Sequence, residues 1–366
     1  MRLFVVSSVY QFFNALSVQL NDPSVESDLL CVARVLDDTF DWDKLREEGI
    51  FHSVYVWTGE IERFRMVSRS KKEHYVNTLK KAGLALGKRK LRREIPCPRK
   101  QYDEICFAYP DYPSRLAIQT LRDKNTRITH LEDGTYTYDA FTKKASTLKK
   151  LAFRMLVGED AWERVERIYV YRPEMLRLPE GKKAEVVQIR QELDKISPVV
   201  KRVYKHELPE LEMIDRSVIM FDQTLEDPVV SARQNEIANM AADIFGEGDV
   251  VVKMHPRSLL DPYDERISCY RAKCPFEVLM STMNMQDKVL ISMVSTACMN
   301  PKLMLDVEPT VIFTLKISGV EQFFLLNDEM LALIERFRAA YRDPSKVYVP
   351  ETMEELQAIL KKMKGE

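Results

Sequence analysis

The chain has 366 residues, of which 45% are hydrophobic and 30% charged, so it can bury a large core and its length favours two domains. Its formal net charge of −1 provides no global attraction to nucleic acid or to an anionic membrane. No apolar run reaches the roughly 18 residues of a membrane-spanning helix, and the N-terminus lacks the pattern of a signal peptide. We therefore expect a cytoplasmic protein whose six cysteines, which form no CxxC pair, are reduced.

Short apolar segments alternate with helical segments through the first half of the chain. The expected strands lie within residues 2–8, 28–35, 51–57, 102–109, 126–134 and 164–176. The expected helices lie within residues 9–20 and 41–49, in a long basic stretch, and across the polar segment 183–206. The pattern then breaks, which predicts a boundary near residue 207.

The same alternation begins again after that boundary. The expected strands lie within residues 217–225, 248–258, 288–293 and 309–315, and the expected helices within 231–245, 275–283 and 352–363, with a further helix beginning near 295. The sequence thus predicts an α/β protein with two Rossmann-like domains, 1–206 and 207–366, which have mostly parallel sheets and face each other across a cleft. The final helix could pack back on the first domain. There is no GxGxxG and no P-loop, so a phosphate would be held by side chains and helix N-termini.

Glu132 and Asp133 stand at the end of a predicted strand, directly before Gly134. The glycine permits a turn that aims a carboxylate into a cleft, where it could accept a proton from a substrate hydroxyl. Taken alone, the stretch fits slightly better as an Asp-Gly turn in a hairpin formed with residues 135–140.

In the second half, His255 ends a buried strand, and Pro256 prevents that strand from continuing. The imidazole could donate a proton or, when charged, pair with a leaving phosphate; the alternative is a histidine that merely caps a turn. Ser295 and Thr296 stand where a helix is expected to begin, a position that suits either capping or phosphate binding.

Three further features have simpler explanations. Glu277 lies in the first turn of an expected helix, where a carboxylate is favourable in any case, although it could also accept ribose hydroxyls. Asp41 and Asp43 form a DxD pattern, but their position predicts a helix cap rather than a metal site. Residues 61–100 hold 14 lysines and arginines against three glutamates, a composition typical of a solvated helical face and also suited to an anionic glycan, lipid head groups or, least favoured, RNA.

Four short motifs occur in a characteristic order: EDG at 132–134, HP at 255–256, PFE at 275–277 and ST at 295–296. Together with the opening segment SSVYQFFNAL, this set resembles the bacterial lipooligosaccharide sialyltransferases of glycosyltransferase family 52, to which the bacterial polysialyltransferases are related. The resemblance extends over roughly residues 1–320. It implies a GT-B fold and a metal-independent, inverting transfer of sialic acid from CMP-sialic acid to a sugar hydroxyl of a bacterial surface glycan such as lipooligosaccharide or capsule.

Carried over residue by residue, the resemblance makes Asp133 the general base and gives His255 the task of assisting the departing CMP phosphate. Ser295 and Thr296 are implied at that phosphate and Glu277 at the ribose. The remaining residues assigned to donor binding are Pro256 and Gln223.

No cofactor or metal is expected. The expected partners are the CMP-sugar donor, a glycan acceptor ending in galactose and, through 61–100, the inner face of the membrane; nucleic acid is not expected, and a homodimer is possible. The first domain would bind the acceptor and the second the donor. The alternatives are a polysialyltransferase, a transferase using another CMP-sugar such as CMP-Kdo, a non-catalytic nucleotide- or glycan-binding module and, least favoured, an RNA-binding protein.

Overall fold

The computed structural model divides into two compact units, Met1–His206 and Glu207–Glu366. It describes residues 1–366 with the exception of 33–38, 60–87, 99–101, 143–160, 191, 206–210, 224–226, 256–257, 259–260, 272–273, 321–325 and 366. Most of the basic segment 61–100 therefore lies outside the described residues, as does Pro256. No helix among the described residues is long and apolar enough to cross a membrane.

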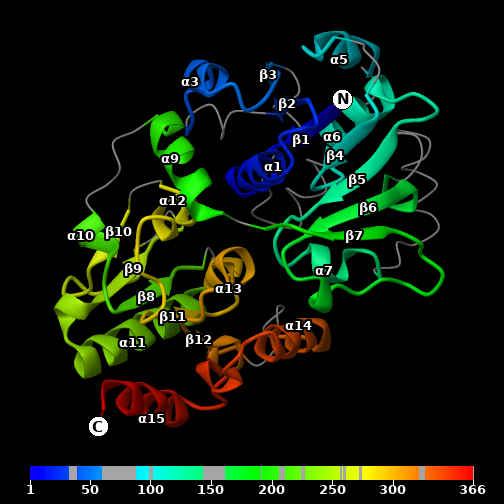
Figure 1. Ribbon diagram of the computed structural model, residues 1–366. Coiled ribbons are helices and arrows are strands. Elements are labelled where there is room, and N and C mark those ends of the chain that lie inside the picture. Colours follow the sequence, from blue (N-terminus) through cyan, green and yellow to red (C-terminus); the bar gives the residue numbers. More distant parts are fainter. Residues whose placement is uncertain are drawn as a thin grey trace. The chain divides into compact units, whose positions relative to one another are not determined.

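The first unit is built on a seven-stranded sheet with the order β3-β2-β1-β4-β5-β6-β7, in which every neighbouring pair is parallel (Figure 1). Its strands are β1 (Arg2–Val6), β2 (Ser27–Val32), β3 (Ser53–Trp57), β4 (Glu104–Phe107), β5 (Arg127–Leu131), β6 (Val165–Val170) and β7 (Glu185–Gln188). Its α-helices are α1 (Val9–Asn21), α3 (Trp42–Glu47), α5 (Lys88–Glu94), α6 (Tyr112–Leu121), α7 (Thr137–Ala140) and α9 (Leu193–Val203). Short 3-10 turns are η2 (Ala161–Arg164) and η3 (Pro173–Met175).

The chain adds β2 and β3 on one side of β1 and β4 to β7 on the other, so the strand order reverses between β1 and β4. Parallel strands covered on both faces by helices are buried throughout, as the fully buried residues of β1, β2 and β4 show. Ligands of such sheets bind beyond the carboxyl ends of the strands at this reversal. The loops after β1, β4 and β5 are therefore the place to look for a site in this unit.

Two local predictions for the first unit are wrong. Residues 183–206 form a strand, β7, before the helix α9, because Val186 and Val187 extend the sheet as an edge strand beside β6. The hairpin after Gly134 does not form either: residues 137–140 are the helix α7, and only an isolated bridge joins Asp133 to Thr135.

The second unit repeats the architecture with a six-stranded parallel sheet, ordered β10-β9-β8-β11-β12-β13. Its strands are β8 (Val218–Phe221), β9 (Val250–Lys253), β10 (Cys269–Tyr270), β11 (Val289–Ser292), β12 (Thr310–Phe313) and β13 (Val347–Tyr348). Its α-helices are α10 (Leu211–Ile214), α11 (Pro228–Phe245), α12 (Phe276–Met280), α13 (Asn300–Leu305), α14 (Asp328–Ala339) and α15 (Met353–Lys364). Its 3-10 turns are η4 (Glu247–Asp249), η5 (Thr296–Cys298), η6 (Leu315–Ile317) and η7 (Pro344–Lys346). The α/β prediction with parallel sheets is confirmed in both units.

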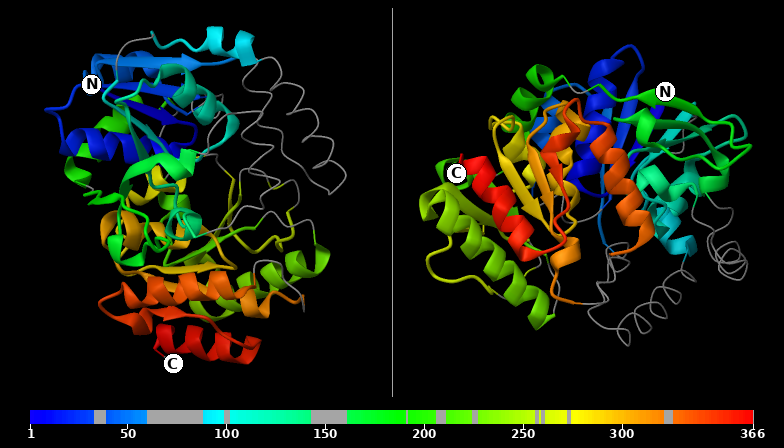
Figure 2. Two further views of the ribbon diagram at one scale, coloured as in Figure 1. Left: turned by 90° about the vertical axis from the view of Figure 1, so that its right-hand side faces the viewer. Right: turned by 90° about the horizontal axis from the view of Figure 1, so that it is seen from below.

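The closing helix α15 packs differently from the sequence-based expectation. Figure 2 shows α15 beside α11, and its Leu356 and Leu360 are fully buried in the core of the second unit. The reason is its amphipathic pattern, which turns these two leucines, four residues apart, toward one face.

Candidate functional site

Asp133 lies directly after β5, at the edge of the first sheet where the strands end. Gly134 has φ +61°, a conformation open to glycine at little cost, so the chain turns sharply behind the carboxylate. The backbone N–H of Asp133 donates to Thr137 Oγ1 at 2.7 Å, and Gln11 Nε2 in the first turn of α1 donates to Asp133 Oδ1 at 2.9 Å. The side chain is thus fixed by groups that follow two different strands, β1 and β5.

The environment of Asp133 favours a basic carboxylate. Burial raises its pKa above the ordinary value, the charge of Asp111 adds to this rise, and the hydrogen bond from Gln11 opposes it. The residue nevertheless keeps partial exposure. A partly accessible carboxylate with a raised pKa can take a proton from a hydroxyl, which is the chemistry required of a general base.

Glu132, in contrast, is fully buried and cannot reach a substrate. Its Oε1 accepts from the Tyr10 hydroxyl at 2.7 Å, and its Oε2 accepts from the Tyr138 hydroxyl at 2.8 Å and from the Tyr171 N–H at 2.7 Å. Its backbone carbonyl accepts from Asn14 Nδ2 at 2.8 Å. Burial raises the pKa of Glu132 to about 7 despite these donors. Glu132 therefore ties α1, α7 and the end of β6 to the turn that carries Asp133.

In the second unit, His255 and Gln223 follow neighbouring strands, β9 and β8. The His255 N–H donates to Asp222 Oδ2 at 3.3 Å, and the same carboxylate accepts from the hydroxyls of Ser258 and Tyr263, the latter at 3.1 Å. The buried Asp222 thereby shapes the turn that bears His255. Gln223 is held through its backbone N–H, which donates to Gln234 Oε1 of α11 at 2.9 Å.

Ser295 and Thr296 follow β11, the strand on the other side of β8. The prediction of a helix starting here needs correction, because residues 296–298 form only the 3-10 turn η5 and α13 begins at Asn300. Ser295 Oγ accepts from the Ala297 N–H at 3.3 Å, so it acts as the cap of this turn. An anion at this turn would therefore be bound by the hydroxyls of Ser295 and Thr296 and not by the N-terminus of a long helix.

Glu277, in the first turn of α12, accepts from Asn300 Nδ2 at 3.0 Å, and burial raises the pKa of its carboxyl. The amide oxygen of the same side chain, Asn300 Oδ1, is buried and accepts no hydrogen bond from any described residue. Glu277 and Asn300 thus form a polar pair that keeps spare hydrogen-bonding capacity.

Lys253, the last residue of β9, is a further candidate that was not predicted from the sequence. It is 6% exposed, and its side-chain ammonium forms no hydrogen bond or ion pair with any residue that the structure describes. Its ammonium lies 5.6 Å from the centre of the Tyr270 ring. Burial lowers its pKa, while the charge of Glu277 opposes that fall. A charged residue at the end of an otherwise apolar strand is the sequence signal that could have identified it.

The DxD pattern is a helix cap, as predicted. Asp41 Oδ1 accepts from the N–H groups of Asp43 and Lys44 at 3.1 and 3.2 Å, and Asp43 pairs with Arg46. Both carboxylates are thereby used within α3.

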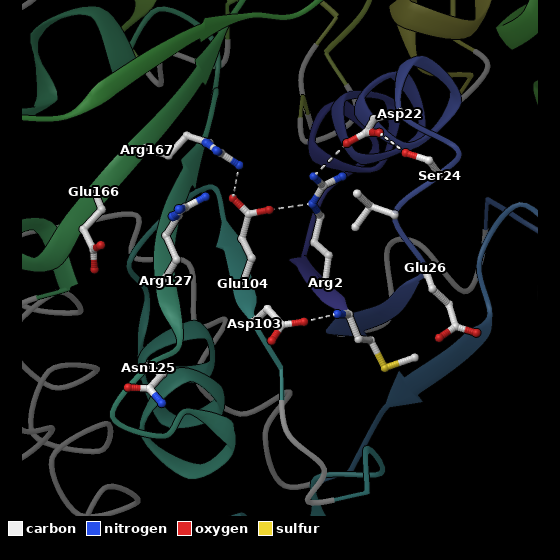
Figure 3. Close-up of a pocket in the computed structure, with 12 residues that line it drawn as sticks. Arg2, Asp22, Ser24, Glu26, Asp103, Glu104, Asn125, Arg127, Glu166 and Arg167 are labelled. Carbon is white, nitrogen blue, oxygen red and sulfur yellow. Dashed lines mark hydrogen bonds and ion pairs between the residues drawn. The ribbon is translucent and has the colours of Figure 1, made fainter.

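A cavity of about 770 Å³ lies at the opposite edge of the first sheet, where the strands begin (Figure 3). Arg2 Nε donates to Glu104 at 2.7 Å, and Arg167 Nη1 donates to the same carboxylate at 3.0 Å. Burial raises the pKa of Glu104, but a hydrogen bond from Thr129 and the two arginines more than offset it, so the pKa is below its ordinary value. Several of the acidic and basic side chains that line this cavity thus form ion pairs with one another. These ion pairs join β1, β4 and β6, and we assign them no catalytic role.

Comparisons with known proteins identify the family to which the chain belongs. The model of the family "Alpha-2,8-polysialyltransferase" matches residues 60–313, a range that contains Asp133, His255, Glu277 and the Ser295–Thr296 pair. No curated protein sequence is significantly similar to the chain.

Solved structures are similar in fold at low sequence identity. The glycotransferase of kitacinnamycin is 10% identical, with 100% of this chain and 91% of that chain covered and a TM-score of 0.53. Arabidopsis thaliana UGT89C1 complexed with UDP is 11% identical, with 100% and 93% covered and a TM-score of 0.48. The first likeness confirms the predicted two-domain GT-B fold. Because the family model covers more than half of its residues, the chain belongs to the alpha-2,8-polysialyltransferase family of glycosyltransferases.

Proposed function

We propose that the protein is an inverting, metal-independent sialyltransferase that moves sialic acid from CMP-sialic acid to a hydroxyl of a bacterial surface glycan. The observation that carries the proposal is Asp133: a partly exposed carboxylate with a raised pKa, fixed by Gln11 and by the turn at Gly134. Membership of a polysialyltransferase family supports a sialic-acid donor and a glycan acceptor for such a base.

In the proposed step, the acceptor hydroxyl loses its proton to Asp133 while its oxygen forms a bond to the anomeric carbon of sialic acid. The bond from that carbon to the phosphate oxygen breaks, and CMP leaves with the electron pair. The first unit thus supplies the base for the acceptor and the second unit binds the donor.

Lys253, His255, Ser295 and Thr296 are proposed to serve the CMP group, with Glu277, Gln223 and Pro256 completing the donor site. A buried cation whose side chain has no hydrogen-bonded partner gains most from an anionic ligand, and among the described residues Lys253 is such a cation. Because CMP carries one phosphate, positively charged and hydroxyl-bearing side chains could stabilise its departure without a metal ion.

The decisive experiment compares Asp133→Asn and His255→Ala with the wild-type protein in a transfer assay using CMP-sialic acid. Loss of a general base should lower kcat by about 10²–10⁴-fold, with the thermal unfolding curve unchanged. Since transfer needs the ionised carboxylate, the wild-type rate should rise with pH through the raised pKa of Asp133. An Asp133→Asn protein that kept most of its activity would exclude this mechanism.

A thermal-shift screen with CMP, CDP, UDP and GDP tests the donor class separately, because at equal concentration the nucleotide that binds most tightly raises the melting temperature most. Stabilisation by UDP and not by CMP would contradict the proposed donor. CMP-sialic acid and CMP-Kdo, compared as substrates, then distinguish the sugar. Binding of CMP without turnover of either donor on any acceptor would instead favour the non-catalytic module.

A second candidate, extension of a polysialic acid chain, is favoured by the family description. Chromatography of the products distinguishes the two activities: addition of one residue indicates a monosialyltransferase, and a ladder of longer products indicates a polymerase. The narrower resemblance to lipooligosaccharide sialyltransferases remains a prediction, which the same experiment tests with galactose-terminated acceptors.

A further inference from the structure

Tyr109, two residues after β4, presents an exposed aromatic ring at the edge of the sheet where Asp133 lies. Its side chain is 43% exposed, whereas large apolar side chains of the described residues are mostly buried. Its ring centre lies 5.2 Å from that of Tyr136, with 58° between the planes, and Tyr136 in turn lies 6.2 Å from Trp162. The exposed ring is therefore the outer member of an aromatic series that continues inward.

The loop that carries this ring is held in place. The Asp111 N–H donates to the Tyr109 carbonyl at 2.8 Å, and Arg115 Nε donates to the Pro110 carbonyl at 2.6 Å. Asp111 also caps α6 by accepting from the Ser114 N–H at 2.8 Å. An exposed ring on a fixed loop loses little freedom when it binds a ligand, which makes it an effective contact.

Tyr109 also lies close to the proposed base. β4 and β5 are parallel neighbours, with Phe107 opposite His130, so Tyr109 and Asp133 leave the sheet from adjacent strands at the same edge. Burial raises the pKa of the Tyr109 hydroxyl, and the charges of Asp111 and Asp133 raise it further.

We propose that Tyr109, supported by Tyr136, is the subsite for the acceptor sugar: a pyranose ring stacks on Tyr109 and thereby presents one of its hydroxyls to Asp133. The C–H face of a pyranose is apolar and its rim carries hydroxyls, so it matches an aromatic face beside a hydrogen-bond acceptor. The inference rests on the proposed transferase function and adds to it the residue that positions the acceptor.

The test is a steady-state comparison of Tyr109→Ala, Tyr109→Phe and Val186→Ala with the wild-type protein. Galactose-terminated and sialic-acid-terminated oligosaccharides are screened first, and the variants are assayed with the acceptor that the wild-type protein uses best. Val186, on the edge strand β7, is 37% exposed and serves as the control for losing exposed apolar surface. Donor binding is followed in parallel by the thermal shift with CMP.

We expect Tyr109→Ala to raise the acceptor KM by about 10-fold or more, with an unchanged donor KM and CMP shift. Tyr109→Phe keeps the ring and should stay within about twofold of the wild type, as should Val186→Ala. This pattern differs from that of Asp133→Asn, which should lower kcat.

An acceptor KM for Tyr109→Ala that equals the wild-type value would overturn the stacking site and leave the transferase proposal intact. If the wild-type protein transferred no sugar, the transferase proposal would fail, and direct titration of the oligosaccharides, followed by NMR, would decide about the subsite. Binding that is lost in Tyr109→Ala and kept in Tyr109→Phe would support it, and binding unaffected by either change would refute it.

Discussion

Replacement of Glu132 by Gln tests whether burial raises the pKa of this carboxyl in the folded protein. The carboxyl is fully buried and accepts three hydrogen bonds, from the hydroxyls of Tyr10 and Tyr138 and from the Tyr171 N–H. A glutamine can keep all three contacts. Its carbonyl can face the two donors on Oε2, and its amide can donate to the Tyr10 hydroxyl, which can rotate to accept.

The expected magnitude follows from the pKa of Glu132. Burial raises this pKa from 4.5 to about 7, which corresponds to about 3 kcal/mol between the protonation states. Because the folded state favours the protonated carboxyl, the stability that it contributes is fully present below pH 4.5 and is lost as the pH rises through about 7. Glutamine does not titrate. The free energy of unfolding of the wild type should therefore fall by roughly 2 to 3 kcal/mol relative to that of Glu132→Gln between pH 5 and pH 8.

Urea unfolding at several pH values, followed by tryptophan fluorescence, measures this difference. The three tryptophans, Trp42, Trp57 and Trp162, all belong to the first unit, so the signal reports on the unit that contains Glu132. The exposed Glu174 of the same unit, changed to Gln, is the matched control and should not alter the pH dependence. Parallel pH profiles for the wild type and Glu132→Gln would refute the reasoning. Glu132→Ala, which leaves three buried donors without partners at about 1–3 kcal/mol each, should prevent the first unit from folding stably.

Three further changes have effects that the structure determines. Glu104→Gln leaves the buried guanidinium of Arg2 without its main counter-charge and should lower the free energy of unfolding in urea by about 3–5 kcal/mol. The double variant Arg2→Met/Glu104→Met removes both charges and should lower the free energy of unfolding by less. Gly134→Ala places a side chain at φ +61°, so it should cost about 1 kcal/mol in the same assay and lower kcat by displacing Asp133. Lys253→Met removes a buried charge and should leave the melting temperature unchanged or raised while weakening CMP binding by about 10-fold in calorimetry; unaltered CMP affinity would exclude Lys253 from the donor site.

Buried parallel strands were the most predictable part of the fold, because helices on both faces make each of them a continuous apolar run. The edge strand β7 was mistaken for helix for the complementary reason: three of its four residues are exposed, so no buried run marks it. Asp133 could be located because a strand end and a glycine are both visible in the sequence. Its partner Gln11 could not, since that contact depends on β1 lying beside β4 and β4 beside β5.

The two sheets have equivalent strand orders, yet the loops that follow their strands carry different charges. In the first unit, Asp133 follows β5, and burial together with the charge of Asp111, in the loop after β4, raises the pKa of Asp133 and makes it a better proton acceptor. In the second unit, β9 ends in Lys253, and the turn beyond it carries His255. A base that takes a proton from an acceptor and cations that stabilise a departing phosphate are opposite electrostatic requirements.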